Sequence, residues 1–119
     1  MNYKNDVIAQ KDFLKKNIKG LNETLSLKLG IKVHLKLKEE SDWRGNVYYK
    51  LHDDTNLRDL CGVVKFAFKE ITIGTWGIYW NDDYVVFNFH YFYTHSDGGS
   101  NGCALCSVLI KNDEITIIR

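Results

Sequence analysis

Residues 31–38, IKVHLKLK, alternate strictly between apolar and polar side chains. A period of two is the pattern of a β-strand that buries one face and leaves the other in water. The buried face would carry Ile31, Val33, Leu35 and Leu37. The sequence therefore predicts a strand over 31–38, and the rest of the chain has to supply strands that pair with it.

The next run, WRGNVYYKLH at 43–52, predicts the first of those partners. Its apolar residues share one strand face, which would hold Trp43, Val47, Tyr49 and Leu51. The polar stretch EESD at 39–42 separates the two runs and is typical of a turn. We therefore expect the two strands to form a hairpin.

The N-terminal segment has the spacing of an amphipathic helix over residues 4–29. The apolar positions that recur at helical intervals are Val7, Leu14, Ile18, Leu21 and Leu25. Gly20 can divide this segment. If Gly20 ends a first helix, Asn22 can cap a second, short one that stops at Gly30.

Residues 53–70 fit two patterns. Val64, Phe66 and Phe68 alternate as in a strand, whereas a larger set falls on one helical stripe, namely Leu57, Leu60, Cys61, Val64 and Phe68. Asp54 or Thr55 can cap the start of such a helix. We favour a helix over about 55–70.

Four more strands complete the chain: ITIGTWGIYW at 71–80, YVVFNFHYFYT at 84–94, CALCSVLI at 103–110 and EITIIR at 114–119. NDD and KND provide turns between them. The predicted fold class is α+β, with an N-terminal helix followed by β-β-α-β-β-β-β in a largely antiparallel six-stranded sheet with helices on one face. We expect a single domain over 1–119, with a helical segment at 1–30 and the sheet at 31–119.

Composition narrows the function. A chain of 119 residues with 45% hydrophobic and 26% charged residues is typical of one folded domain. A net charge of +1 gives neither the basic field of a general nucleic-acid binder nor the acidic surface of a DNA mimic. The sequence has no secretory signal and no membrane span, and three cysteines fit a reducing compartment. We expect a cytoplasmic protein.

The strand at 84–94 is aromatic on both faces. Val85, Phe87, Phe89, Tyr91 and Tyr93 point one way, and Tyr84, Val86, Asn88, His90 and Phe92 point the other. Trp76, Ile78 and Trp80 add to the aromatic content of the sheet. An exposed aromatic patch of this kind usually marks a partner or a ligand, and the alternative is a sheet covered on both faces by its own helices.

Cys103 and Cys106 have the C-x-x-C spacing of zinc sites and redox pairs, and His90, His95 and Cys61 could complete a ligand set. On a regular strand, positions three apart project to opposite faces, and no helix follows as in a thioredoxin-like motif. We therefore interpret the cysteines as structural and expect no metal and no cofactor.

The stretch HSDGGSNG at 95–102 predicts a hairpin loop of about eight residues, longer than the connection needs. It lacks the convergent groups of a catalytic triad and the helix that follows a phosphate-binding loop. We interpret it as a recognition loop, with a passive insertion as the alternative. The candidate binding residues are His95, Ser96, Asp97, Ser100 and Asn101 of the loop with Trp76, Trp80 and His90 of the sheet; no catalytic residue is assigned.

Lysine outnumbers arginine thirteen to three and proline is absent, which is the usage of an AT-rich genome. In size, composition and aromatic sheet, the chain resembles in general character the small phage and prophage proteins that inhibit bacterial defence systems. No functional residue can be assigned from that resemblance.

The function we expect is a non-catalytic inhibitory protein of a phage or mobile element that contacts a host protein. A small-molecule or nucleotide binder is the alternative, with Trp76, Trp80 or Trp43 stacking on a base or sugar. In that case His95, Asp97 and Asn101 of the 95–102 loop would supply polar contacts. A small hydrolase or nuclease that uses His95 is the third option. The apolar C-terminal strand at 114–119 also predicts a homodimer if it lies at a sheet edge.

Overall fold

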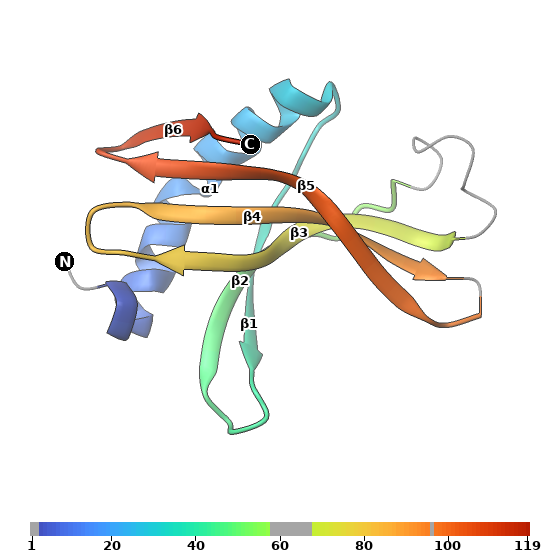
Figure 1. Ribbon diagram of the computed structural model, residues 1–119, viewed down its shortest axis with the longest axis horizontal. Helices are drawn as coiled ribbons and strands as arrows, with labels where there is room; N and C mark the ends of the chain where they lie inside the picture. The colour runs from blue at the N-terminus through green and yellow to red at the C-terminus, as the bar shows by residue number, and fades with distance from the viewer. Residues whose placement is uncertain (1–2, 58–67, 96) are drawn as a thin grey trace.

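The computed structural model describes residues 3–57, 68–95 and 97–119, which form one long helix and six strands (Figure 1). A 3-10 turn, η1 (Tyr3–Asn5), precedes the helix α1 (Val7–Leu29). The strands are β1 (Lys36–Ser41), β2 (Val47–Asp53), β3 (Phe68–Trp80), β4 (Val85–His95), β5 (Ser100–Lys111) and β6 (Glu114–Ile117). They form one sheet in sequence order, and every neighbouring pair is antiparallel. The predicted α+β class is confirmed.

Helix α1 is continuous and does not divide at Gly20. Asp6 caps its start by accepting a hydrogen bond from the amide of Ala9, and Gly30 ends it in a left-handed conformation (φ 70°). A Cβ at Gly20 would lie 2.6 Å from Cδ1 of Ile115, so glycine at this position allows β6 to approach the helix closely. The predicted amphipathic helix is therefore confirmed, and the alternative of two short helices, the second capped by Asn22, is not adopted.

The strand predicted over 31–38 begins later, at Lys36. Val33 and Leu35 are buried as the alternation predicted, but the backbone of 31–35 is held by side chains rather than by a neighbouring strand. The amides of Val33 and Leu35 donate to Ser26 and Asn22 of α1, both at 2.8 Å, and the amide of His34 donates to Asp53. Burial against the helix therefore produces the same period of two as pairing in the sheet.

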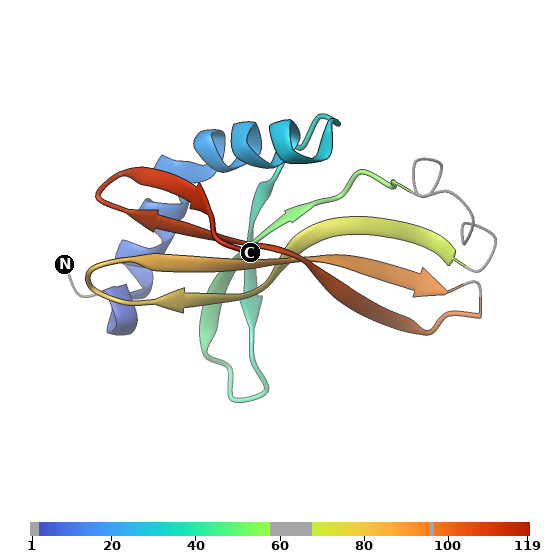
Figure 2. The same ribbon diagram turned by 45° about the horizontal axis from the view of Figure 1, so that its top comes forward.

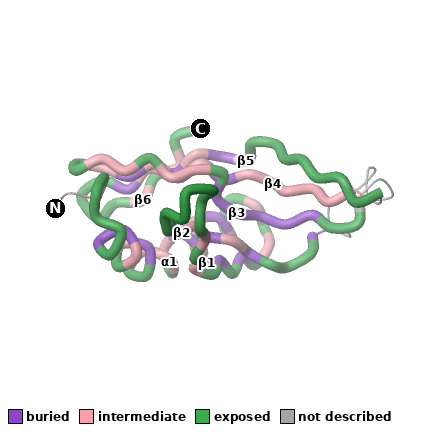
Figure 3. The backbone as a smooth tube through the Cα atoms, turned by 90° about the horizontal axis from the view of Figure 1, so that it is seen from below, coloured by how far each residue is buried: buried purple, intermediate pink, exposed green. Residues whose placement is uncertain are grey.

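Strands β1 and β2 form the expected hairpin, and we call Lys36–Asp53 the arm. The turn lies later than predicted, because β1 continues through Ser41, and Trp43 is in the turn rather than on the face of β2. Figure 1 shows the arm standing away from the other four strands. Most of its residues are exposed (Figure 3).

Helix α1 packs on one face of the sheet, which we call the inner face; the opposite side is the outer face (Figure 2). The core between them is apolar and fully buried at its centre. It includes Leu14, Leu21 and Leu25 of α1, Leu51 of β2, Ile71 and Ile73 of β3, Val85, Phe87 and Phe89 of β4, and Val108 of β5. The burial of these side chains fixes which face of each strand points to the helix.

Two β-bulges change which side chains share a face. The register of β3 on β4 shifts between Thr75 and Gly77, so Trp76 lies on the outer face while Trp80 faces inward. The register of β5 on β4 shifts at Phe89/His90, where Cys106 pairs with Phe89 and Cys103 pairs with Tyr91. Both cysteines therefore lie on the inner face, and the expectation that they project to opposite faces was wrong.

The turns were predicted unevenly. Residues 81–84 and the Asn112–Asp113 pair form turns as expected, the latter with φ of 51° and 61° as in a type I′ turn. The loop predicted over 95–102 is shorter, because β4 runs to His95 and β5 starts at Ser100.

Most of the helix predicted over about 55–70 lies outside the described residues. At its flanks, residues 55–57 are not helical and Phe68–Glu70 belong to β3.

The arm joins the rest of the sheet through a small junction. Within the described residues, β2 pairs with β3 only at His52↔Gly74 and Asp53↔Ile73. At the next position the hydroxyl of Thr75 replaces a backbone partner, since its Oγ1 accepts from the amide of Leu51 (3.1 Å) and donates to the Leu51 carbonyl (3.3 Å). The strands separate beyond this point.

The junction predicts a sharp difference between two glycines of β3. A Cβ at Gly74 would collide with Nδ1 of His52 and lie 3.0 Å from the Leu51 carbonyl oxygen, whereas one at Gly77 would meet nothing within 4 Å. We expect Gly74→Ala to lower the free energy of unfolding by about 1–3 kcal/mol, because the crowded strands have to shift. Gly77→Ala is the matched control and should change it by less than about 1 kcal/mol. Urea unfolding measures both, and equal effects would contradict the described junction.

The cysteines predict a difference in reactivity. Cys103 is exposed, whereas Cys106 is buried, and burial raises the pKa of the Cys106 thiol. Because the thiolate is the nucleophile, iodoacetamide should alkylate Cys103 in the native protein and Cys106 only after denaturation. Peptide mass spectrometry over a time course would measure this. Alkylation of both thiols at one rate would contradict the burial of Cys106.

Candidate functional site

Four rings form a continuous cluster on the outer face, at the centre of the sheet. The indole of Trp76 stacks on the imidazole of His90, with centroids 5.4 Å apart and planes 20° apart. Phe92 lies 6.4 Å from Trp76, 6.3 Å from His90 and 5.5 Å from His52. We call Trp76, His90, Phe92 and His52 the outer aromatic cluster. It connects β2, β3 and β4.

Trp76 remains 70% exposed even though it stacks on His90. Trp76 lies on the outer face by the alternation of β3, and the bulge that follows Thr75 leaves it without a ladder partner on β4 and brings Ile78 and Trp80 to the inner face. Large apolar rings are normally buried, so a tryptophan held in place and left open to solvent is the most informative feature of this face.

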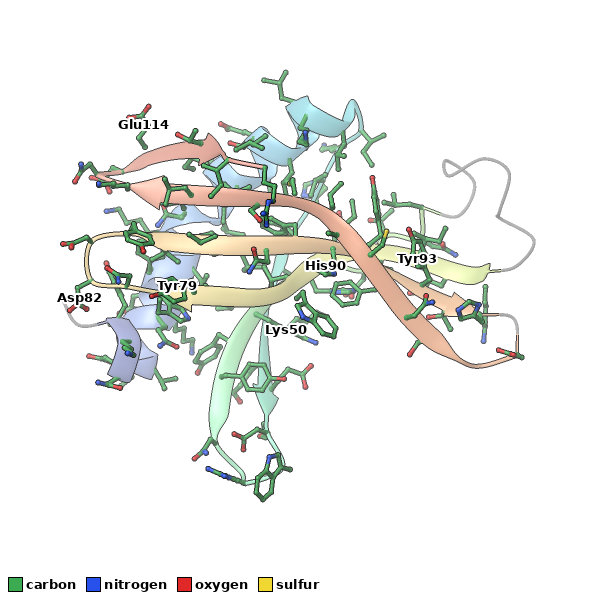
Figure 4. All side chains as sticks on the ribbon, in the orientation of Figure 1. Lys50, Tyr79, Asp82, His90, Tyr93 and Glu114 are labelled. Atoms are coloured by element: carbon green, nitrogen blue, oxygen red, sulfur yellow. The ribbon has the colours of Figure 1, made fainter. Side chains whose placement is uncertain are left out.

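A groove of about 700 Å³ lies in the corner where the arm leaves β3. The arm forms one wall with Tyr48, Lys50 and His52, and β3 forms the other with Trp76. Figure 4 shows Lys50 near the root of the arm and His90 on β4. The groove therefore combines an aromatic floor with a cationic side chain and an imidazole.

A second hollow, of about 420 Å³, lies on the other side of Trp76. It is lined by His90, Asn88, Ser107 and Arg119 together with Trp76 itself. The hydroxyl of Ser107 donates to Oδ1 of Asn88 (2.9 Å), which fixes that amide. Trp76 thus stands as a ridge between two concave regions, a shape that can fit a complementary surface.

The charged groups beside the groove are largely paired with one another. Nζ of Lys38 lies 2.9 Å from Asp54, and Nζ of Lys50 lies 3.1 Å from Glu40. The hydrogen bond from Lys38 lowers the pKa of the Asp54 carboxyl. Pairs of this kind leave little net field across the outer face.

His52 is neutral in this setting. Burial lowers the pKa of its imidazole, and Lys50 and Lys38 lower it further, while Asp54 acts in the opposite direction. Only 21% of its side chain is exposed. A buried imidazole with a lowered pKa stays uncharged at neutral pH.

The structure separates the residues that the sequence grouped as one site. Trp76 and His90 lie together on the outer face, whereas Trp80 packs against Phe13 (5.7 Å) and Tyr3 (5.8 Å) on the inner side. Ser100 pairs with Thr94 and faces outward, while Asn101 pairs with Tyr93 and faces inward. The loop residues and the Trp76–His90 pair are therefore not one constellation.

The short loop is organised by its own hydrogen bonds. The amide of His95 donates to the Gly99 carbonyl (2.7 Å), and the Asp97 carboxylate accepts from the Gly99 amide (3.1 Å). Gly98 has a φ of 96°, which favours glycine. Ser96 lies outside the described residues. Asp97 thus stabilises the turn, which is its simplest role.

Several prominent residues were missed by the sequence analysis. Lys50 and His52 line the groove, and Phe92 joins the cluster, yet none of them was singled out. The period-two pattern does place Lys50, His52 and Phe92 on the wet faces of their strands, so this signal was present. The convergence of β2 and β3 at one corner depends on tertiary structure and could not be obtained from it.

The tip of the arm is a second exposed feature. Trp43 is 86% exposed, and the guanidinium of Arg44 lies 4.6 Å from the centroid of its ring. The turn at the tip is held by Asp42, whose Oδ1 accepts from the amides of Arg44 (2.8 Å) and Asn46 (2.9 Å). Tryptophan and arginine are the residues most enriched at binding hot spots.

The chemistry available here is recognition by stacking, shape and a few hydrogen bonds. In the part of the chain that the structure describes, no three His, Cys, Asp or Glu residues gather in a way that could hold a metal ion. The same residues contain no helix with the length and apolarity that crossing a bilayer requires.

Comparison of the chain with protein-family models, with curated proteins and with solved structures finds no match in any of the three. The geometry of the outer face is therefore the basis on which a function is proposed.

Proposed function

We propose that this chain is a non-catalytic binding protein that acts by protein–protein contact through its outer face. In this proposal it is an inhibitory factor of a phage or mobile element of an AT-rich bacterium, and it acts in the cytoplasm on a host defence protein. The observation that carries the binding role is Trp76, which is 70% exposed yet fixed by stacking on His90. The proposed phage or mobile-element origin and the proposed host target are based on the size and composition of the chain.

The outer face has the character of an interface core rather than of an ordinary wet sheet face. Trp76, Tyr79 and Tyr48 are its large exposed rings, and aromatic residues of this kind are enriched where proteins bind one another. Tryptophan and tyrosine also lose little conformational entropy on binding, especially where the ring is already fixed. The two hollows beside Trp76 add the concavity that an interface needs to exclude water around its central residue.

A small ligand is the second candidate, and the groove favours it. A volume of about 700 Å³ is within the range of ligand pockets, and its lining includes Trp76 for stacking and Lys50 for an anionic group. A nucleotide has both features. The internal pairing of Lys50 with Glu40 weakens this case, since a phosphate would have to compete with that carboxylate.

Substitution of Trp76 tests the outer face directly. We expect Trp76→Ala to weaken binding to the protein that copurifies from the host by at least about 30-fold, because it removes the central exposed ring. Leu27→Ala is the matched control, since Leu27 is 87% exposed but lies on α1, away from the outer face. Titration calorimetry with the identified protein would measure both affinities.

Native mass spectrometry of the protein isolated from its host separates the candidates. A bound protein supports the first proposal, and a bound nucleotide-sized mass supports the second. If Leu27→Ala weakens binding as much as Trp76→Ala does, the outer face is not the binding surface.

We also propose that the chain forms a homodimer through a sheet edge. The strand β6 lies at one edge and pairs only with β5 within the described residues, so its other side has free backbone groups. Light scattering at micromolar concentration should then give twice the monomer mass of 13.8 kDa. A monomeric mass across that range, without a partner, would count against the dimer.

A further inference from the structure

Few backbone pairs join the arm to β3, and His52 is at the centre of them, while the neighbouring Leu51 is buried in the core. Two ladder pairs and the Thr75 hydroxyl join β2 to β3, as described above. His52 belongs to one of those pairs, its ring packs directly on the backbone of Gly74, and it contacts Phe92 of β4 at 5.5 Å. Any change that disfavours this position of the ring therefore acts on the whole junction.

The surroundings of His52 suit a neutral ring. Neither ring nitrogen makes a hydrogen bond within the described residues, and Nδ1 lies over Gly74, where a Cβ on that residue would collide with it. A protonated imidazole has two N–H donors, and burying a charged donor without an acceptor costs stability. The nearest carboxylate oxygen, on Asp54, is 4.0 Å from Nε2, beyond hydrogen-bond distance.

The lysines around the ring oppose its protonation, while Asp54 and Asp53 favour it. Three lysines of the arm surround it: Lys36 is its cross-strand partner, and Lys38 and Lys50 pair with each other in the next register. Asp54 is already shared by Lys38 (2.9 Å) and Lys36 (4.0 Å), so its attraction for a charged imidazole is partly cancelled.

The other titratable groups near the ring are more distant or already engaged. Glu70 of β3 lines the same groove, and His90 lies beyond Phe92. Asp53 points inward and accepts from the amides of His34 and Thr55. The charges around His52 act in both directions, and burial is the largest cause of its lowered pKa.

We propose that His52 makes the attachment of the arm pH-sensitive: protonation of its imidazole releases the arm from β3 in mild acid and opens the groove that the arm walls. Release of the arm would change the groove on the outer face, so the biological role of this pH response rests on the proposed binding function. The physical event itself belongs to the free protein. Once the arm is released, His52 is in water and binds a proton normally, so acid favours the released state.

The sign follows from linkage. The pKa of His52 is lowered when the arm is attached, so the attached state binds fewer protons than the released state below the ordinary histidine pKa. Attachment is therefore fully stable above about pH 6.5 and weakens as the pH falls toward the lowered pKa. Each unit of difference in pKa between the two states can raise the released fraction by up to about tenfold.

Amide hydrogen exchange of the free protein tests this at the level of single residues. The amide of Leu51, which donates to Thr75, reports the junction, while the amides of Phe87 and Val108 report the core of the sheet. Between pH 7.5 and 5, we expect the Leu51 protection factor to fall by about threefold or more beyond the intrinsic effect of pH, with Phe87 and Val108 unchanged. The 19F resonance of 5-fluorotryptophan at Trp76 should shift over the same pH range, and that of Trp80 should not.

Variants separate titration of His52 from a general effect of acid. His52→Gln should abolish the pH dependence at Leu51, whereas the matched control His34→Gln, at an exposed position near the arm, should keep it. Should His52→Gln fail to fold, two charge variants still test the proposal. Asp54→Asn should lower the His52 pKa and increase the acid loss of protection, and Lys50→Gln should do the opposite.

Two results would overturn the proposal: a Leu51 protection factor that follows those of Phe87 and Val108 at every pH, or a pH dependence that survives in His52→Gln. Because no partner is present, the outcome is independent of whether Trp76→Ala weakens binding. A pH-sensitive arm with an unaffected partner affinity would separate this device from the proposed binding surface.

Discussion

The junction between β2 and β3 is the constraint on which the rest of the surface depends. Two backbone pairs at His52 and Asp53 attach the arm, and the Thr75 hydroxyl satisfies Leu51 where the strands separate. A hydroxyl can serve as both donor and acceptor, so one side chain replaces both backbone bonds. The departure of β2 at this point creates the groove and sets its arm wall. Without the separation, β2 would cover the edge of β3 and no groove would exist.

The same stretch of β3 explains why the outer face is aromatic and open. Immediately after Thr75, a bulge leaves Trp76 unpaired on the outer face, and from there to Trp80 no strand of the described chain pairs with the free edge. An unpaired edge normally invites aggregation, and proteins protect it with bulges or with a covering element. Here the bulge and the nearby arm both serve this purpose, so the features that form the candidate site also protect the edge.

The sequence predicted those parts of the fold that depend on local pattern. The long helix, the order of the strands, the β1–β2 hairpin and the turns at 81–84 and 112–113 follow from periodicity and turn residues. The predictions failed where one extra residue in a strand shifts the inward–outward alternation of the side chains that follow it. A bulge at Trp76 places Trp76 and Trp80 on opposite faces, and a bulge in β5 places Cys103 and Cys106 on one face. Nothing in a strand's own pattern requires a bulge, because its position depends on the neighbouring strand.

The site was predictable only in part, for the same reason. Trp76 and His90 were named from their residue types, and the structure stacks them. Their partner His52 comes from a strand about forty residues away, and only the β2–β3 junction brings it to Phe92. The loop residues were predicted as binding residues because His, Ser and Asp have polar, reactive side chains. In the structure, the backbone bond between His95 and Gly99 and the bond from the Gly99 amide to Asp97 form a turn. Residue type thus identified the stacked pair, and topology determined what surrounds it.

The pairing of charges on the arm determines what kind of recognition this surface can offer. Two ion pairs, Lys38–Asp54 and Lys50–Glu40, neutralise much of the charge on and beside the arm. Exposed pairs of this kind add little stability, yet they remove the long-range field that would steer a polyanion. What remains on the outer face is apolar ring area, two hollows and an imidazole kept neutral by burial. We propose that a surface of this composition selects a partner by shape and desolvation, which is the mode expected of a protein interface rather than of a nucleic-acid groove.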